Sequence, residues 1–427
     1  MKYLSSMLFF LAMMIGICTS ANAAKPKQDL FPDGTKIPAW FADTTRIDVA
    51  KLGKQYVITQ YGVRNDSTII QTEAIQRVID QCKEEGGGVI VFPEGTFLSG
   101  SLFFYEGTHL HIRKGGTLKG IDDIRHYRLL PTRIEGQTIN YFAALVNADH
   151  ANGFTISGEG TINGNGKRFW EEFWLRRQYN RKCTNLEAMR PRCVYISNSN
   201  DVTVSGVRII NSGFWTNHLY KCQRVKYLGV YIFAPTPGTG DVKAPSSDGL
   251  DLDACQDVLV NSCFMNVNDD GVCLKGGKGT FVDKDSTNGP CRNIIVQNCH
   301  FAEAGGGITF GSESFDDRNV IIRNCTFNGT SHILLFKMRP DTPQKYEYVL
   351  AENCSGTLKN MIQVSAWTQF FNPQKRDDMP RSVVRNVTMR NINVTCTKII
   401  YNINPSEKYD LENINFENIQ ATLQKTE

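Results

Sequence analysis

Asn293-Ile-Ile-Val-Gln-Asn-Cys299 recurs one unit later as Asn319-Val-Ile-Ile-Arg-Asn-Cys325, and these two stretches decide the fold. Each one is a short run of β-branched residues between polar turn residues, which is typical of a strand. Related units begin at Asp201-Val-Thr-Val, Arg224-Val-Lys-Tyr, Asp257-Val-Leu-Val, Tyr348-Val-Leu-Ala and Asn386-Val-Thr-Met. Strand units that return every 20–50 residues or so indicate a solenoid, in which each coil buries its apolar face on its neighbours.

The segments between these units favour a parallel β-helix over a sheet of alternating strands and helices. No apolar pattern of helical period separates the strands, and polar or glycine-containing turns follow each run. Asn and Gly at such corners adopt the left-handed backbone angles that tight turns require. We therefore expect an all-β, single-stranded parallel β-helix, with loops inserted at the corners where the spacing is longer.

The cysteines follow the same repeat. The chain has 13 of them, which in an exported protein first suggests disulfides. Their positions within the repeat instead predict buried stacks of thiols, one containing Cys222, Cys255 and Cys291 and the other Cys263, Cys299, Cys325 and Cys354. A disulfide stays open for Cys183 and Cys193, which lie in a less regular stretch. The absence of a CxxC or paired-histidine motif argues against zinc.

The N-terminus has the pattern of a signal peptide over residues 1–23. Lys2 precedes an apolar stretch at Leu8 to Ile17, and Ala21-Asn-Ala23 fits a cleavage site. The apolar stretch is short for a membrane span, so we expect an exported protein, periplasmic or secreted, without a membrane span. Residues 24–60 are interpreted as a lead-in and residues 61–427 as one β-helix catalytic domain, expected to be a monomer.

Two segments depart from the strand pattern. Residues 71–82 place Ala74, Ile75, Val78, Ile79 and Cys82 at helical spacing, and three glycines at 86–88 follow. This predicts a helix, capped by Thr72, that covers the open N-terminal end of the solenoid. The charged and aromatic segment from Lys167 to Arg192 is expected to form a helical excursion or a long loop beside a cleft.

The charge balance restricts the partners. The formal net charge is only +4, and basic and acidic residues are interspersed. Nucleic-acid binding is therefore not expected, whereas a mildly basic cleft suits an acidic polysaccharide.

Two acidic motifs carry the chemistry. They are Ser247-Asp-Gly-Leu-Asp-Leu-Asp253 and Asn268-Asp-Asp-Gly271, about one coil apart. Either motif alone is an ordinary turn sequence. Stacked on neighbouring coils, however, Asp248, Asp269 and Asp270 would face one another, and repulsion between them would raise some pKa values. Such a set supplies a general acid and a general base, as glycosidic bond hydrolysis requires.

Together with four further stretches, these motifs resemble glycoside hydrolase family 28, the polygalacturonase and rhamnogalacturonan hydrolase family. The resemblance spans roughly residues 55–420, and the further stretches are residues 72–82, 86–95, 115–120 and 211–218. It implies a right-handed parallel β-helix and inverting hydrolysis of a pectic polysaccharide or oligosaccharide, without a cofactor or metal. Asp269 then matches the general acid, and Asp248 and Asp270 match the pair that activates water. The expected substrate-binding residues are Lys337, His218, Lys275 and Asp251.

The chain departs from the family pattern at two positions. Gly306 stands where the family usually has a histidine, and Leu335 where it usually has an arginine, while Lys337 is kept. An apolar side chain cannot replace the two-pronged hydrogen bonding of an arginine to a carboxylate. Either the enzyme is inactive, or its leaving-group site takes something other than galacturonate. The pattern slightly favours a rhamnogalacturonan-type or substituted substrate over plain homogalacturonan.

Two other functions stay open on the same fold. A calcium-dependent pectate lyase would use clustered aspartates as oxygen ligands. A non-catalytic glycan-binding β-helix would bind pectin without releasing reducing ends. The inserts at Thr236 to Pro245 and Gly276 to Pro290 are expected to wall one end of the cleft, which would favour action at chain ends.

Overall fold

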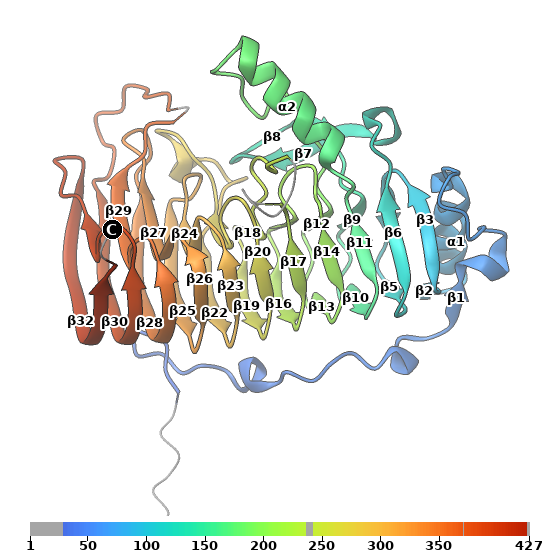
Figure 1. Cartoon of the computed structure of the whole chain (residues 1–427), viewed down its shortest axis with the longest axis horizontal. Coiled ribbons are helices and arrows are strands. Elements are labelled where there is room, and N and C mark those ends of the chain that lie inside the picture. Colours follow the sequence, from blue (N-terminus) through green and yellow to red (C-terminus); the bar gives the residue numbers. More distant parts are fainter. Residues whose placement is uncertain (1–28, 236–241, 370, 425–427) are drawn as a thin grey trace, which may run out of the picture.

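The chain forms a parallel β-helix, as predicted (Figure 1). The structure is a computed structural model, and it describes residues 29–235, 242–369 and 371–424. The predicted signal peptide therefore lies outside the described residues. Three faces of stacked parallel strands run along the solenoid, and its first strand is Gln55–Val57, just before the predicted domain start at residue 61.

One face is a ten-stranded sheet made of β4 (Leu102–Phe104), β9 (Val146–Asp149), β12 (Val194–Ser197), β15 (Asn217–Tyr220), β18 (Leu250–Asp253), β21 (Val272–Lys275), β24 (Gly306–Phe310), β27 (His332–Met338), β29 (Ile362–Ala366) and β31 (Tyr401–Ile403). The second face contains β1 (Gln55–Val57), β2 (Gly88–Phe92), β5 (Thr108–Ile112), β10 (Thr155–Gly158), β13 (Thr203–Ser205), β16 (Gln223–Leu228), β19 (Gln256–Asn261), β22 (Cys291–Gln297) and β25 (Asp316–Arg323). The third contains β3 (Gly95–Ser99), β6 (Gly116–Gly120), β11 (Thr161–Asn163), β14 (Arg208–Ile210), β17 (Tyr231–Phe233), β20 (Phe264–Asn266), β23 (His300–Glu303) and β26 (Thr326–Thr330). The second and third faces join through the long strands β28 (Lys345–Leu358), β30 (Ser382–Cys396) and β32 (Tyr409–Leu423).

The repeat units identified in the sequence begin at left-handed corners. Their first residues have φ between 54° and 59°, and they are Asp201, Arg224, Asp257, Asn293, Asn319, Tyr348 and Asn386. Side-chain amides connect these corners from coil to coil: Asn319 Nδ2 donates to Asn293 Oδ1 at 3.2 Å, and Asn293 Nδ2 donates to Asp257 Oδ1 at 2.9 Å. Asparagine suits both tasks, because it tolerates this backbone region and carries a donor and an acceptor.

The cysteines lie inside the solenoid as thiols. All twelve cysteines of the described residues are buried and free, which confirms the predicted stacks. Cys183 and Cys193 are also free, so the disulfide left open between them is not formed. In this role the thiol is a small apolar side chain that fills the corner of a coil.

The ten-stranded sheet has two rows of side chains that alternate along each strand. The inward row is apolar and runs through Leu219, Leu252, Leu274, Phe310 and Phe336. The outward row is one residue earlier on the same strands and runs through His218, Asp251, Cys273, Thr309 and Leu335. Members of both rows are buried, so the outward row is covered by further structure.

A helix caps the N-terminal end, as predicted. Helix α1 (Thr72–Glu84) packs Ile75, Val78, Ile79 and Cys82 against the first coil. Thr72 does not cap it: the N-cap is Gln71, and the Thr72 hydroxyl instead accepts a hydrogen bond from the amide of Gly100 at 2.7 Å. The predicted excursion beside the coils is helix α2 (Lys167–Tyr179), and the hairpin β7 (Leu129–Ile134) and β8 (Gln137–Phe142) lies near it (Figure 1).

The lead-in is an extended strap along the outside of the solenoid (Figure 1). Phe31, Ile37 and Phe41 pack on an outward-facing apolar stripe of the second face, made of Leu228, Leu259, Ile295 and Ile321. The ion pairs Arg318–Asp33, at 3.0 Å, and Lys226–Asp43, at 2.9 Å, tie the strap to the coils.

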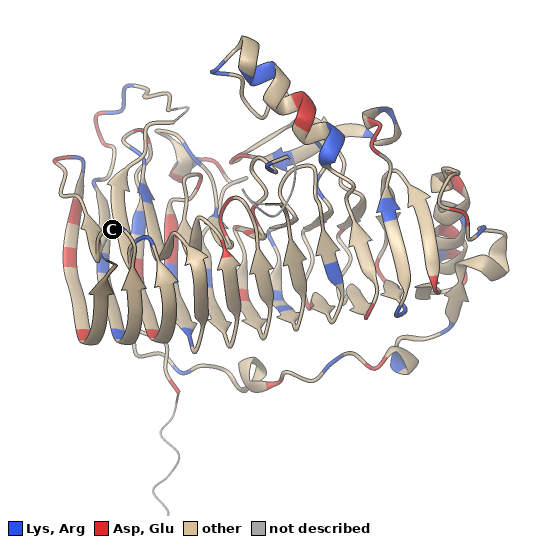
Figure 2. Ribbon diagram, viewed as in Figure 1, with Lys and Arg blue, Asp and Glu red and all other residues tan. Residues whose placement is uncertain are grey.

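Acidic and basic residues are mixed along the whole solenoid, without a single-sign tract (Figure 2). Among the described residues, no helix is long and apolar enough to cross a membrane.

Candidate active site

The three predicted catalytic aspartates meet above two neighbouring strands. Asp248 lies just before β18, and Asp269 and Asp270 lie just before β21. One carboxylate oxygen of each lies within 4.8 Å of the others. Backbone hydrogen bonds fix this alignment: the Gly249 amide donates to the Asp270 carbonyl at 2.8 Å, and the Gly305 amide donates to the Asp269 carbonyl at 2.7 Å.

These aspartates line a cavity of about 200 Å³. Its other lining residues are Glu135, Asn185, Trp215, Ser246, Lys275, Ser312, Glu313, Lys337, Trp367 and Gln369. The sequence-predicted Lys275 and Lys337 are therefore at the cavity, together with two tryptophans whose rings stand 4.5 Å and 4.8 Å from the two ammonium groups. Trp367 thus lines this cavity, whereas Trp170 and Trp174 of helix α2 do not.

Both lysines are paired with carboxylates of the chain. Lys337 Nζ donates to Asp270 Oδ2 at 2.6 Å. Lys275 Nζ lies 3.3 Å from Asp251 Oδ1, 3.3 Å from Glu313 Oε2 and 3.6 Å from Asp248 Oδ2. Burial opposes the charge of each lysine, but the surrounding carboxylates raise the pKa of both above the ordinary value.

The acid groups have different electrostatic surroundings. Burial, together with the charges of Asp248 and Asp270, raises the pKa of Asp269 to about 8. Burial and the charge of Asp251 raise the pKa of Asp248 well above its ordinary value. Asp270, by contrast, accepts a hydrogen bond of 2.6 Å from Lys337. The arrangement thus places a carboxyl group whose raised pKa keeps its proton near pH 7, Asp269, beside one that is bonded to an ammonium group.

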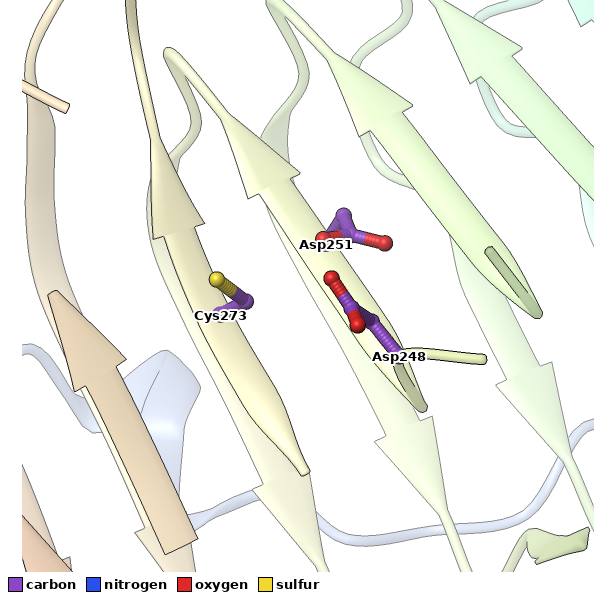
Figure 3. Close-up of side chains that lie close together, drawn as sticks. All are labelled: Asp248, Asp251 and Cys273. Carbon is purple, nitrogen blue, oxygen red and sulfur yellow. The ribbon is translucent and has the colours of Figure 1, made fainter. Parts of the chain in front are cut away.

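His218 and Asp251 lie beneath the cavity and not in its lining. Both are fully buried members of the outward row, so the prediction that they bind substrate directly does not fit their position. Asp251 lies beside Asp248 on the β18 segment, and Cys273 stands on the neighbouring strand (Figure 3). Asp251 contacts Lys275 and therefore supports the cavity from below.

A second group of buried charged side chains surrounds His218. Arg192 donates to its Nδ1 at 2.7 Å, and its Nε2 faces Asp253 Oδ2 at 3.5 Å. Burial lowers the pKa of His218 to about 4, so the ring is neutral near pH 7. Asp253 also accepts from Arg133 of the hairpin at 3.0 Å. Burial would raise the pKa of Asp253, but Arg133 lowers it below its ordinary value.

Two groups of side chains in this cluster lie close enough together to hold a cation. Ligand atoms of Asp248, Asp251 and Cys273 lie within 4.8 Å of one another, as do those of Asp248, Asp269 and Asp270. Lys275, however, already places a positive charge beside Asp248 and Asp251, and Lys337 places one on Asp270. Two buried ammonium groups repel a calcium ion at this position, so the residues do not fit the metal that the lyase alternative requires.

Sequence reasoning did not assign roles to Glu135 and Glu313. Burial would raise the pKa of Glu313, but Lys275 and Lys278 lower it below its ordinary value. Glu135 comes from the turn of the β7–β8 hairpin, far from the repeat. Its position could not be predicted from the repeat. Glu313, by contrast, lies within the repeat, shortly after the end of β24.

The two departures from the family pattern are neighbours in space. A Cβ atom built on Gly306 would lie 3.3 Å from Leu335 Cβ and 2.5 Å from Thr309 Oγ1. Leu335 is 5% exposed and belongs to the outward row. The space next to Gly306 is thus filled by Leu335 and Thr309. Gly306 and Leu335, which replace the usual histidine and arginine of the family, therefore form one apolar patch.

Comparisons with known proteins identify the family of this chain. The model of the glycosyl hydrolases family 28 matches residues 118–427. An endo-polygalacturonase of Pectobacterium parmentieri is 25% identical over 70% of this chain and 71% of its own length. A probable polygalacturonase of Vitis vinifera is 25% identical over 52% of this chain, and the match covers 44% of its own length. A crystal structure of an exopolygalacturonase from Thermotoga maritima superposes with a TM-score of 0.69 at 23% identity, covering 85% of this chain and 86% of that one.

Proposed function

The chain belongs to the glycosyl hydrolases of family 28, and on that premise we propose that it hydrolyses glycosidic bonds of a pectic polysaccharide or oligosaccharide. The observation that supports this most is the cluster of Asp248, Asp269 and Asp270 in one cavity, with oxygens within 4.8 Å. A hydrolase needs a proton donor and a base at one bond, and the raised pKa of Asp269 suits the donor, with Asp248 and Asp270 beside it.

The proposed reaction uses one water. Asp269 gives its proton to the glycosidic oxygen as the bond from that oxygen to the anomeric carbon breaks. A water held by Asp270 and Asp248 attacks that carbon and loses a proton to a carboxylate. The leaving sugar departs with a free hydroxyl, and the proton taken from water restores Asp269 through exchange with solvent. Trp367 borders the cavity and is partly exposed, so it can pack against a sugar ring, whereas Trp215 is buried and stacks on Phe214.

The stereochemical course follows from the family resemblance, which implies inversion. The carboxylate oxygens, however, lie within 4.8 Å of one another. Inverting enzymes usually separate their carboxyl groups by about 6.5–9.5 Å, and retaining enzymes by about 5–5.5 Å. Proton NMR of the first product, recorded before its anomers equilibrate, reads the configuration directly. A retained configuration would overturn the assignment of Asp248 and Asp270 to water activation.

The charge of the cavity favours a neutral sugar at the leaving-group site. The carboxyl groups of its lining outnumber the two lysines, and both lysines are paired within the chain. Gly306 and Leu335, which stand where the family usually has a histidine and an arginine, are buried outside the lining of this cavity and supply no cation to it. A carboxylate placed in the cavity would meet repulsion without a compensating cation. This supports a rhamnogalacturonan-type backbone, in which neutral and acidic sugars alternate, over plain homogalacturonan.

The test is reducing-sugar release from a panel of pectic fractions by the wild-type protein and by Asp269→Asn. We expect release from rhamnogalacturonan fractions and its loss in the variant. Products that absorb ultraviolet light through an unsaturated sugar would instead support the lyase. Binding without any release would support the glycan-binding alternative. Export to the periplasm or the cell exterior, where such polymers lie, and a monomeric state belong to the same proposal.

A further inference from the structure

A second cavity, of about 370 Å³, lies next to the catalytic one. We call it the insert pocket. Its lining residues are Gly136, Gln137, Lys278, Gly279, Thr280, Phe281, Val282, Asp285, Asn288, Arg339, Asp341, Asn372 and Gln374. They come from the hairpin turn, from the insert at residues 276–290 and from two segments that follow β27. Its volume is within the range of about 300–1,000 Å³ that is usual for ligand sites.

Hydrogen bonds between its three walls hold the insert pocket open. Arg133 of the hairpin donates to Asn288 Oδ1 at 2.7 Å and to the Gly276 carbonyl at 3.2 Å. The Gly279 amide donates to Thr342 Oγ1 at 2.9 Å, and the Gln374 amide donates to Thr280 Oγ1 at 3.0 Å. The pocket is therefore preformed, and a ligand would not have to order these segments.

The insert pocket and the catalytic cavity share one wall. Glu135 lines the catalytic cavity, and the next residue, Gly136, lines the insert pocket. A Cβ atom on Gly136 would lie 3.1 Å from the Lys278 amide nitrogen, so the hairpin turn and the insert touch here. Lys278 Nζ lies 3.8 Å from Glu135 Oε2, across this wall. A chain that leaves the catalytic cavity over this wall would therefore reach the insert pocket.

The lining has the features of a site for an acidic sugar. Phe281 is 44% exposed, which is unusual for a phenylalanine and presents an apolar face to a sugar ring. Arg339 and Asp341 neutralise each other through two hydrogen bonds, at 2.9 Å and 2.8 Å. Lys278 has a longer contact of 3.8 Å with Glu135, its charge also acts on Glu313, and its side chain is 19% exposed. A carboxylate in the pocket would replace that contact with a closer one.

We propose that the insert pocket binds a uronic-acid residue of the substrate through Lys278 and Phe281, one sugar away from the cleaved bond. This rests on the proposed hydrolysis of a pectic chain and deepens it. A neutral sugar in the catalytic cavity and an acidic sugar in the insert pocket together select a chain in which the two alternate. Lys278 and Phe281 bind the substrate and take no part in the bond cleavage.

The test compares Lys278→Gln with Lys284→Gln, a matched change of an exposed lysine in the same insert that lies outside the pocket lining. The substrates are pectic oligosaccharides and the same oligosaccharides with their carboxyl groups reduced to alcohols. For Lys278→Gln, we expect the ratio of kcat/KM on acidic over reduced substrate to fall roughly tenfold, mainly through KM, because one charge-assisted hydrogen bond is lost. Lys284→Gln should keep the wild-type ratio. An unchanged ratio in Lys278→Gln, or an equal loss on both substrates, would overturn the proposal.

Binding separates this proposal from the proposed function. Calorimetric titration of Asp269→Asn with the acidic oligosaccharides measures the pocket without catalysis. Binding that weakens when Lys278→Gln is added supports the insert pocket even if the wild-type protein hydrolyses nothing. Absence of binding, or binding that ignores Lys278→Gln and Phe281→Ala alike, overturns it. Thermal melting of each variant identifies a loss of fold, and Phe281→Ala then supplies the independent change.

Discussion

The inward and outward rows of the ten-stranded sheet come from alternate residues of the same strands, yet they have opposite chemistry. The inward row is aliphatic and aromatic and repeats from coil to coil, as in Leu252 and Leu274. The outward row contains Asp251 and Cys273, each one residue before the leucine of its strand. Asp251 is buried and its carboxylate has no direct hydrogen bond, although Lys275 lies nearby. One row thus supplies stability, and the other accepts an electrostatic cost at the place where chemistry is proposed.

The largest effect is expected at the cleft above the outward row. Asp269→Asn should lower kcat by roughly 10²–10⁴-fold, because the amide has no proton to give to the leaving oxygen. Reducing-sugar release checks this, with the exposed Glu159→Gln as the matched control. Activity that survives in Asp269→Asn would remove Asp269 from the mechanism and with it the contrast between the rows.

The next effect tests the inward row. Leu252→Ala should lower the free energy of unfolding by about 2–5 kcal/mol, because it leaves a cavity among close-packed neighbours. Thr309→Val, in the outward row, keeps the shape of the side chain and removes a hydroxyl that has no hydrogen-bond partner. We expect it to change stability by less than about 1.5 kcal/mol. Denaturant unfolding of the two variants measures the difference, and equal losses would mean that both rows serve as core.

The pH dependence sharpens the same contrast. The pKa of Asp269 is raised from 3.8 to about 8, so the folded state holds a proton that the unfolded state loses. The stability from this group is fully present below about pH 3.8 and is lost as the pH rises through about 8. Activity should fall over the upper part of that range, as the general acid loses its proton. A pH series of melting temperatures on wild type and Asp269→Asn checks this, since the variant should lack the loss between about pH 3.8 and about 8.

The smallest effect concerns the thiols. The described cysteines are free and buried, so a reductant should leave the melting temperature unchanged within about 1 °C. A clear decrease on reduction would show that some of these thiols are paired in disulfides in solution.

Much of the fold follows from local sequence, because a solenoid coil is specified by neighbouring residues. The corner asparagines at 293 and 319, the buried thiols and the N-terminal helix were predictable from spacing alone. The meeting of the three candidate catalytic aspartates also follows, since Asp248 and Asp270 occupy equivalent places on adjacent coils and Asp269 precedes Asp270. Glu135 and the insert pocket do not follow, because they depend on how the hairpin folds back on the insert through Arg133, a contact between residues that are distant in sequence.

The strap at the N-terminus has a consequence for how the protein reaches its native state. Phe31, Ile37 and Phe41 leave the ribosome early, but their partners at Leu259, Ile295 and Ile321 are made much later. Until then these three large apolar side chains stay exposed, shortly after the predicted signal peptide. Growth of the solenoid from one end to the other therefore cannot by itself complete the molecule. The first residues must dock on the middle coils in a separate step, once those coils have formed.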